Sequence, residues 1–235
     1  IAILLWSVEK HARAITDLVE DAKTSSDLLR DKLLGRYSWD SNLGEFLTGI
    51  TAGRSFAASP NPASEETFGV LKVSAVGERA FIPSENKELL DQSRFEQRFS
   101  VRRGDLLITR ANTSEYVGRA AIVRDDLPNI MLSDKTLRLE VDPSKSSVEF
   151  VFEFLRASRT RANISSVATG TGAAMKNISQ KQVMGLPMPA LSLDEQASFI
   201  SDIQRFHDAE ASLEGEQDAM TAVNSSLLTV ILGGS

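Results

Sequence analysis

Apolar residues recur every seven positions at both ends of the chain, with polar residues between them. In the first segment the repeat passes through Val8, Ile15 and Leu29, beside a second apolar stripe. A heptad repeat of this kind is typical of helices that pack as a coiled coil. We therefore predict one long helix over residues 2–34, ended by Gly35.

The last forty or so residues repeat this pattern. Ser192 and Glu195 have the spacing of a capping box, which begins a helix by satisfying its free amide groups. Two such helices would form an antiparallel stalk roughly 50 Å long. The two segments also match each other at an offset of 199 residues, which suggests a repeated unit of domain plus helix. The apolar residues that fall seven apart here are Phe199, Phe206, Leu213, Met220 and Leu227.

The middle of the chain alternates strand-like runs with short helical segments. Strands are expected at 68–76, 105–110, 118–124 and 136–141. A second capping box, Ser146 with Glu149, would open a helix to about Ser166, and Ser179 with Gln182 would open a short third one. We predict an α+β domain over 36–191, between stalk segments 1–35 and 192–235.

Composition narrows the possible chemistry. The chain has no cysteine, which excludes disulfides and thiolate metal sites and fits a reducing cytoplasm. Its two histidines, His11 and His207, are expected on helix surfaces, so we predict no metal site, no nucleophilic triad and no cofactor. The apolar start is too short to cross a bilayer, and without an initiator methionine the chain is expected to begin inside a longer protein.

The net charge and the catalytic motifs narrow the possible chemistry further. The net charge of −6 weighs against nucleic-acid binding, although a local basic face remains compatible with it. The chain has no Pro-Pro pair, so the amino-methyltransferase motif is absent. Glu85-Asn86-Lys87 is a weak match to a nuclease triplet that is common by chance. We therefore expect no catalytic residues.

Five short motifs follow one another through the middle of the chain. They are Gly-Val-Leu-Lys-Val-Ser-Ala-Val at 69–76, Arg-Gly-Asp-Leu-Leu-Ile-Thr-Arg-Ala-Asn-Thr at 103–113, Leu-Ser-Asp-Lys at 132–135, Gly-Thr-Gly with Met-Lys-Asn-Ile-Ser at 170–179, and Leu-Pro-Met-Pro at 186–189. In this order they resemble the motifs of a recognition domain in type I restriction-modification specificity subunits. The helix from residue 1 resembles the conserved region between that family's two recognition domains.

This resemblance implies a function and a set of partners. The chain would be a non-catalytic subunit that reads one part of a split double-stranded DNA target. Its partners would be methyltransferase subunits, which carry S-adenosylmethionine, and restriction subunits that cleave. A second recognition half or a second copy of the chain would complete the target.

The same motifs supply candidate DNA contacts. Arg and Asn grip guanine and adenine edges bidentately, and Arg110 and Asn112 follow an apolar strand. Lys176 ends a Gly-rich segment whose free amides suit a phosphate. Lys72 and Ser74 would share one face of a strand. The full set of candidates is Lys72, Ser74, Arg110, Asn112, Thr113, Lys135, Thr171, Lys176 and Asn177.

Several alternatives remain open on sequence alone. Asn112 could instead organise a turn, and the Gly-rich segment could be a flexible connector. Three arginines within 156–161 could form a solvated helix face or a phosphate-binding rail. The chain could be a module of a single-chain restriction-methylation enzyme. It could also be a scaffold that binds only protein through its helices, a possibility that the acidic net charge supports.

Overall fold

A computed structural model describes residues 2–78, 80–170 and 175–232, apart from the side chains at 2–5, 227 and 230–232. The chain divides into two compact units. The helical unit comprises Ile1–Leu33 with Ser198–Ser235, and the globular unit comprises Leu34–Ala197. Helices and strands are mixed within the globular unit, which confirms the predicted α+β class.

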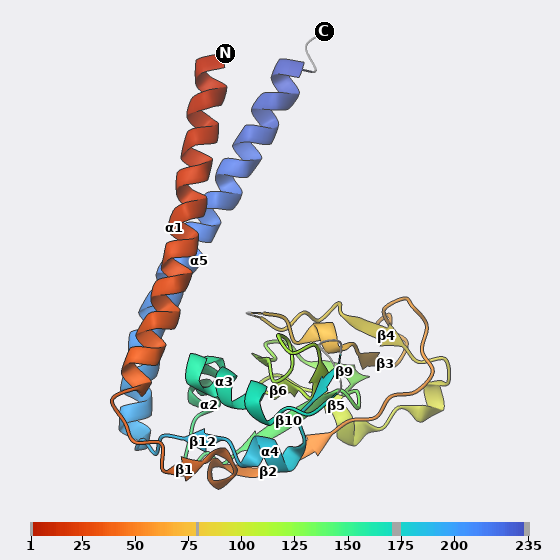
Figure 1. The fold of residues 1–235 in the computed structure, drawn as a ribbon. Helices are drawn as coiled ribbons and strands as arrows, with labels where there is room; N and C mark the ends of the chain where they lie inside the picture. Colours follow the sequence, from red (N-terminus) through yellow and green to blue (C-terminus); the bar gives the residue numbers. More distant parts are fainter. Residues whose placement is uncertain (1, 79, 171–174, 233–235) are drawn as a thin grey trace. The chain divides into compact units, whose positions relative to one another are not determined.

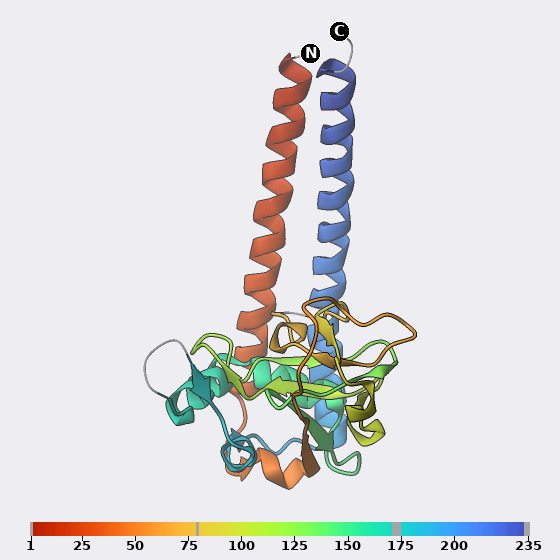
Figure 2. The same ribbon diagram turned by 90° about the vertical axis from the view of Figure 1, so that its right-hand side faces the viewer.

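The helical unit is a pair of long helices. Helix α1 (Ala2–Leu34) has the predicted bounds, and α5 (Leu193–Leu232) begins at the predicted capping box, where the amide of Glu195 donates to the hydroxyl of Ser192. The helices run side by side in opposite directions (Figures 1 and 2). None of the described helices has both the length and the apolar composition needed to span a bilayer.

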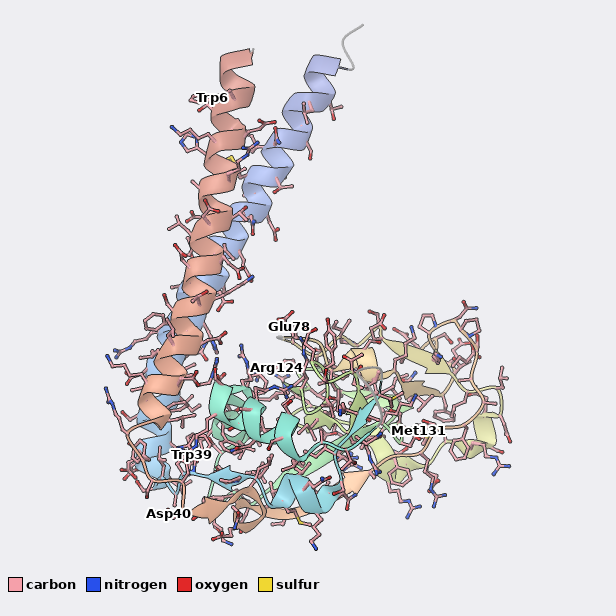
Figure 3. The ribbon with its side chains drawn as sticks, viewed as in Figure 1. Trp6, Trp39, Asp40, Glu78, Arg124 and Met131 are labelled. Atoms are coloured by element: carbon pink, nitrogen blue, oxygen red, sulfur yellow. The ribbon has the colours of Figure 1, made fainter. Side chains whose placement is uncertain are left out.

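The predicted seam of α1 is partly buried. Val8, Ile15 and Leu29 are half-buried, and Val19 is 4% exposed. Other apolar side chains of α1 face away from this seam, among them Trp6, which is 63% exposed (Figure 3). The heptad stripe therefore selects the packed face of α1.

Helix α5 has a narrower apolar seam than its repeat predicts. Leu213 and Met220 are half-buried and Phe206 keeps 39% of its surface exposed, while the side chain of Leu227 lies outside the described residues. The adjacent stripe begins with the buried Ile203 but continues with polar residues, which are half-buried beyond the first. These are Glu210, Gln217 and Asn224. In that region the Gln217 amide donates to Thr16 Oγ1 at 2.8 Å, and Lys23 Nζ lies 2.8 Å from Glu214 Oε1.

Two four-stranded sheets form the centre of the globular unit. The first is antiparallel, in the order β2 (Leu47–Ala52), β10 (Thr136–Val141), β6 (Leu106–Thr109), β8 (Ala120–Ile122). The second has the order β4 (Asn86–Glu88), β3 (Gly69–Leu71), β9 (Leu127–Met131), β5 (Ser100–Val101), with β3 and β9 parallel. Two-stranded pairs join β1 (Ser41–Asn42) to β12 (Pro187–Met188) and β7 (Ala111–Asn112) to β11 (Lys176–Asn177).

One buried core unites the two larger sheets. Leu107 of β6 and Ala121 of β8 pack in the same cluster as Val70, Val101 and Met131 of the second sheet. Met131 is fully buried and lies among the strands (Figure 3). Because apolar surface removed from water is the main stabilising term, this shared core fixes the two sheets against each other.

The helices of the globular unit are short. Helix α2 (Val148–Arg156) packs against β8, and it is followed by α3 (Ser158–Val167) and α4 (Gln180–Met184). The capping box predicted for α4 is present, with Ser179 and Gln182 as its members. Single 3-10 turns occur at Leu43–Phe46, Val73–Ala75, Gln92–Arg94 and Gln97–Phe99.

Two elements of the structure differ from those predicted. The helix expected from Ser146 to Ser166 is broken at Ala157, whose backbone is extended, and its cap is Ser147. Ser146 is buried and donates its hydroxyl to Gln196 instead. The strand expected over 68–76 ends at Leu71, because a 3-10 turn begins at Val73.

Ser26 offers a test of how the helical unit packs. It lies in the buried stripe of α1, 1% exposed, and its hydroxyl has no hydrogen-bond partner among the described residues. A buried hydroxyl without a partner costs about 1–3 kcal/mol, so Ser26→Ala should raise the free energy of unfolding by about 1 kcal/mol. Urea denaturation measures the change. Ser25→Ala, at an exposed neighbour, carries the same gain in helix propensity. Equal gains for the two variants would contradict the prediction.

Candidate functional site

The candidate site is built at the exit of strand β6. Leu106, Leu107 and Ile108 are each at most 1% exposed, because β6 lies between β8 and β10 in the sheet. The turn that leads into β6 requires Gly104, whose φ of +88° is a conformation that favours glycine. Arg110 follows the buried strand directly and is half-buried. The apolar strand therefore delivers Arg110 from a rigid position, as the sequence predicts.

The main chain of Arg110 joins three segments that are distant in sequence. Its N–H donates to the carbonyl of Lys135 at 2.9 Å, and its carbonyl accepts from the N–H of Ile178 at 2.8 Å. The next residues form β7, in which Asn112 stands opposite Lys176 of β11. The structure thus brings together five of the predicted site residues. They are Arg110, Asn112, Lys135, Lys176 and Asn177.

Their side chains differ in availability. The guanidinium of Arg110 and the ammonium of Lys135 make no hydrogen bond or ion pair with any other described residue. Lys176 Nζ donates to the carbonyl of Gly170 at 3.3 Å, which holds the lysine near the Gly-rich segment. Asn177 is exposed, and Thr171 lies outside the described residues.

Asn112 and Thr113 are partly occupied by local structure. Asn112 Oδ1 accepts from the N–H of Thr113 at 2.9 Å, so this asparagine does organise a turn. Its amide nitrogen has no partner among the described residues. The hydroxyl of Thr113 is buried and also lacks a described partner. In this conformation Thr113 therefore cannot present its hydroxyl to a ligand, contrary to the prediction for it.

Arg161, expected on a helix face, instead secures the turn that follows β7. Arg161 Nη2 donates to the carbonyls of Glu115 at 3.1 Å and Val117 at 2.8 Å. Burial, with the nearby Arg119, lowers the pKa of the Arg161 guanidinium, which still stays charged at neutral pH. Arg159 lies 4.3 Å from the ring centre of Trp39. Arg161 is therefore engaged with the protein main chain, whereas Arg159 remains exposed.

Lys72 and Ser74 meet at a carboxylate rather than on a strand. The hydroxyl of Ser74 donates to Glu85, and Lys72 Nζ lies 3.7 Å from Glu85 Oε2. The hydrogen bond from Ser74, aided by the charge of Lys72, lowers the pKa of Glu85. The prediction of a shared strand face is wrong, because Ser74 lies in a 3-10 turn and Lys72 is the residue that precedes it. Glu85 holds this turn, a role that sequence reasoning missed.

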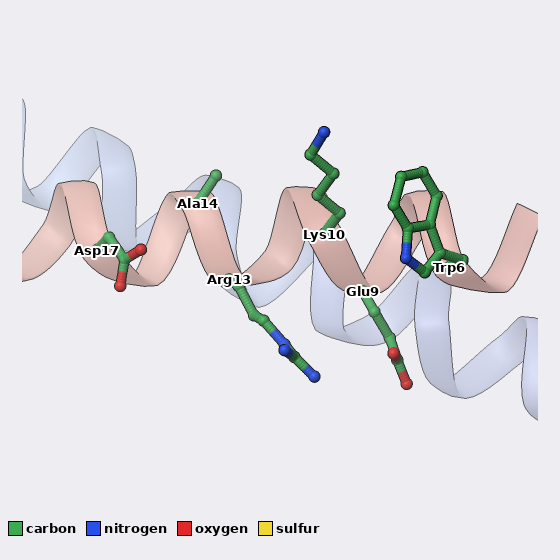
Figure 4. A pocket seen from close by; sticks show the side chains of 6 residues that line it. All are labelled: Trp6, Glu9, Lys10, Arg13, Ala14 and Asp17. Atoms are coloured by element: carbon green, nitrogen blue, oxygen red, sulfur yellow. The ribbon is translucent and has the colours of Figure 1, made fainter.

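A cavity of about 370 Å³ connects the two groups of predicted residues, since Lys72 and Lys135 both line it. A second hollow, of about 340 Å³, lies along the outer face of α1 (Figure 4). There Lys10 Nζ stands 5.3 Å from the ring centre of the exposed Trp6. The residues that line the second hollow are Trp6, Glu9, Lys10, Arg13, Ala14 and Asp17.

The described part of the chain contains no candidate metal site. No three His, Asp or Glu side chains there are grouped so as to hold an ion. His11 Nδ1 lies 2.7 Å from the carbonyl of Ser7 within its own helix. The side chain of His11 is exposed, as expected for a histidine on a helix surface.

Comparison with known proteins gives one clear sequence relative. No protein-family model matches the chain. The specificity subunit of the type I restriction enzyme EcoEI from Escherichia coli is 30% identical over 165 residues, which is 70% of this chain and 28% of that protein. The chain thus spans little more than a quarter of its relative's length.

Solved structures share the fold. The HsdS subunit from Thermoanaerobacter tengcongensis superposes with a TM-score of 0.61 at 16% identity, covering 99% of this chain and 55% of that one. The S subunit of the type I restriction-modification system from M. genitalium gives 0.60 at 14% identity, covering 97% and 58%. The fold is therefore that of specificity subunits. In sequence as well, the resemblance to type I restriction-modification specificity subunits is confirmed.

Gly170 offers a test of the β7–β11 pairing. Its φ is +143°, and a Cβ at this position would lie 2.2 Å from the carbonyl oxygen of Met175. Gly170→Ala should therefore displace β11 and lower the free energy of unfolding by about 1–3 kcal/mol. It should also speed amide exchange at Asn177. Gly104→Ala is the matched control, since it has positive φ but no atom within 4 Å, and it should leave exchange at Asn177 unchanged. Equal exchange at Asn177 in both variants would contradict the prediction.

Proposed function

We propose that the globular unit binds double-stranded DNA and reads one part of a split target. The convergence of Arg110, Asn112 and Lys176 at the joined β7–β11 strands supports this most directly. An arginine and an asparagine provide the donors that grip purine edges, and a lysine provides a point charge for phosphate. The chain would act as a non-catalytic specificity subunit, as its relationship to that class suggests.

The positions of the two side chains suit two different contacts, one with a base and one with a phosphate. Arg110 leaves a fully buried strand, and its guanidinium has no partner in the described part of the chain, so it suits the reading of a base edge. Lys176 is held toward the main chain of Gly170, beside exposed backbone, and suits a phosphate. Phosphate contacts set register, whereas base contacts specify sequence.

The helical unit would dock methyltransferase subunits. An exposed tryptophan is the side chain most enriched at binding hot spots, and Trp6 is surrounded by charged residues of α1. Restriction subunits and a second recognition half, or a second copy, would complete the assembly. The relatives from which these partners are inferred are longer than this chain.

A scaffold that binds only protein is the competing function. Leu18 and Leu28 of α1 are 52% and 65% exposed, and such apolar surface suits a protein partner. The two functions differ in their response to salt. Phosphate contacts release counterions, so DNA affinity should fall steeply as salt rises, whereas a scaffold should show no DNA binding to weaken.

Selection from a random DNA library tests the proposed function. The 235-residue chain should enrich one short sequence. Arg110→Ala should weaken binding to that sequence by about 1–3 kcal/mol and relax preference at one base pair. Lys176→Ala should weaken binding to all sequences alike and reduce the salt slope by about one.

The two variants serve as controls for each other, because each removes one positive charge. A sequence preference altered by Lys176→Ala but not by Arg110→Ala would reverse the assigned roles. No enrichment by the wild-type chain, with no salt-dependent binding, would favour the scaffold.

The absence of catalysis is testable with the isolated chain. Incubated with DNA, Mg²⁺ and labelled S-adenosylmethionine, it should neither transfer label nor cut DNA above background, because its sequence lacks the amino-methyltransferase motif and offers only a weak match to a nuclease triplet. Heat-denatured protein gives the background. Either activity, retained through further purification, would overturn the assignment as a non-catalytic subunit.

A further inference from the structure

The cavity of about 370 Å³ is walled by four separate segments of the globular unit. They are the stretch after β2, the end of β3 with the following turn, strand β4, and the turn before β10. The floor is apolar, since Val70 and Leu71 are 5% and 2% exposed. The lining residues are Ser55, Phe56, Ala58, Val70, Leu71, Lys72, Val73, Lys87, Ser133 and Lys135.

The charge of this wall is unusual for the chain. Its ten described residues include three lysines and no carboxylate, although acidic residues outnumber basic ones in the sequence by 32 to 26. Lys72 has a carboxylate partner in Glu85, but Lys87 and Lys135 make no ion pair with any described residue. The nearby carboxylate of Asp134 accepts the hydroxyl of Ser55. The wall is therefore a concentrated positive surface.

The backbone carries the lysines at fixed positions. Lys87 stands opposite Val70 in the β3–β4 ladder, the N–H of Lys72 donates to the carbonyl of Glu85 at 3.0 Å, and the carbonyl of Lys135 accepts from Arg110. Like charges held around one hollow repel each other unless an anion lies between them. Because the floor is apolar, an anion above it would interact with the lysines more strongly than on open surface.

We propose that this cavity grips a single backbone phosphate of bound DNA, with Lys87 and Lys135 as its contacts. Lys72 adds charge while Glu85 positions it. This inference rests on the proposed function and assigns to Lys87 a role that the sequence motifs do not indicate. Since Lys135 is hydrogen-bonded to the main chain of Arg110, the phosphate contact would fix how Arg110 meets the bases.

Salt dependence of binding tests the proposal, with the full chain and the duplex that it selects. One phosphate contact contributes about 0.9 to the slope of log affinity against log salt. Lys87→Ala and Lys135→Ala should each reduce the slope by about 0.9, because the loss of either lysine releases the one phosphate that both hold. For the same reason the double variant should also reduce the slope by about 0.9. Between 50 and 200 mM salt, the affinity ratio of wild type to each variant should shrink about 3.5-fold.

Matched variants isolate the cavity. Lys32→Ala removes an exposed lysine of the helical unit and should leave the slope unchanged. Lys87→Arg keeps the charge and should keep the slope. Circular dichroism verifies folding, and Lys135→Gln, in an exposed turn, replaces any variant that does not fold.

The outcomes separate the two proposals. Wild-type chain that binds no DNA would overturn the proposed function. Wild-type binding, with the Lys87 and Lys135 variants indistinguishable from Lys32→Ala, would overturn the cavity proposal alone. A loss of about 1.8 in the double variant would mean two phosphates rather than one. Inorganic phosphate that binds the wild type but not the cavity variants, with unchanged DNA slopes, would mark a site for a free anion and overturn the DNA contact.

Discussion

The main-chain hydrogen bonds of Arg110 hold together the surface that the proposed recognition needs. A buried strand that leaves a sheet must satisfy the polar groups of its backbone. Here the carbonyl of Lys135 satisfies the N–H of Arg110, and the N–H of Ile178 satisfies its carbonyl. As a result the segments 132–135 and 175–179 must lie beside the segment 103–113, whatever their own propensities. The candidate side chains meet because the backbone of one residue requires partners.

The acidic balance of the chain is a poor guide to its local charge. Many arginines of the globular unit are engaged by carboxylates, as Arg54 is by Glu96 and Arg138 by Asp105. The side chains of Arg110, Lys87 and Lys135 have no such partner among the described residues. Acidic residues thus neutralise cations elsewhere, while the candidate site keeps its positive charge. Ligand steering depends on this local arrangement rather than on the net charge.

The sequence predicts the elements whose signals are local and strong. Heptads and capping boxes give α1, α5 and α4 with nearly the right bounds. Elements that form by pairing with distant segments are not predicted from the sequence. Strands β7 and β11 have two residues each, which is too few for a periodic pattern to show. Lys87 is missed because β4, Asn-Lys-Glu, has no apolar residue to mark a strand. The motifs identify the segments that form the candidate site. Tertiary contacts decide which side chains remain free, such as Arg110, and which are turned inward, such as Thr113.

The two helices of the helical unit pair through specific polar contacts, while some of their apolar side chains stay exposed. Polar residues at Glu210 and Gln217 occupy a stripe where a simple coiled coil would place leucines. Such residues reduce the apolar area buried, but they favour one register, because a shifted pairing would leave their polar groups without partners. The hydrogen bond from Gln217 to Thr16 is one such contact. A seam of this kind specifies how the helices pair more than it stabilises them. The apolar side chains left outside it, such as Leu18, Leu28 and Val223, remain exposed. That division suits a helical pair whose fixed register presents an outer face to partners, as the proposed assembly requires.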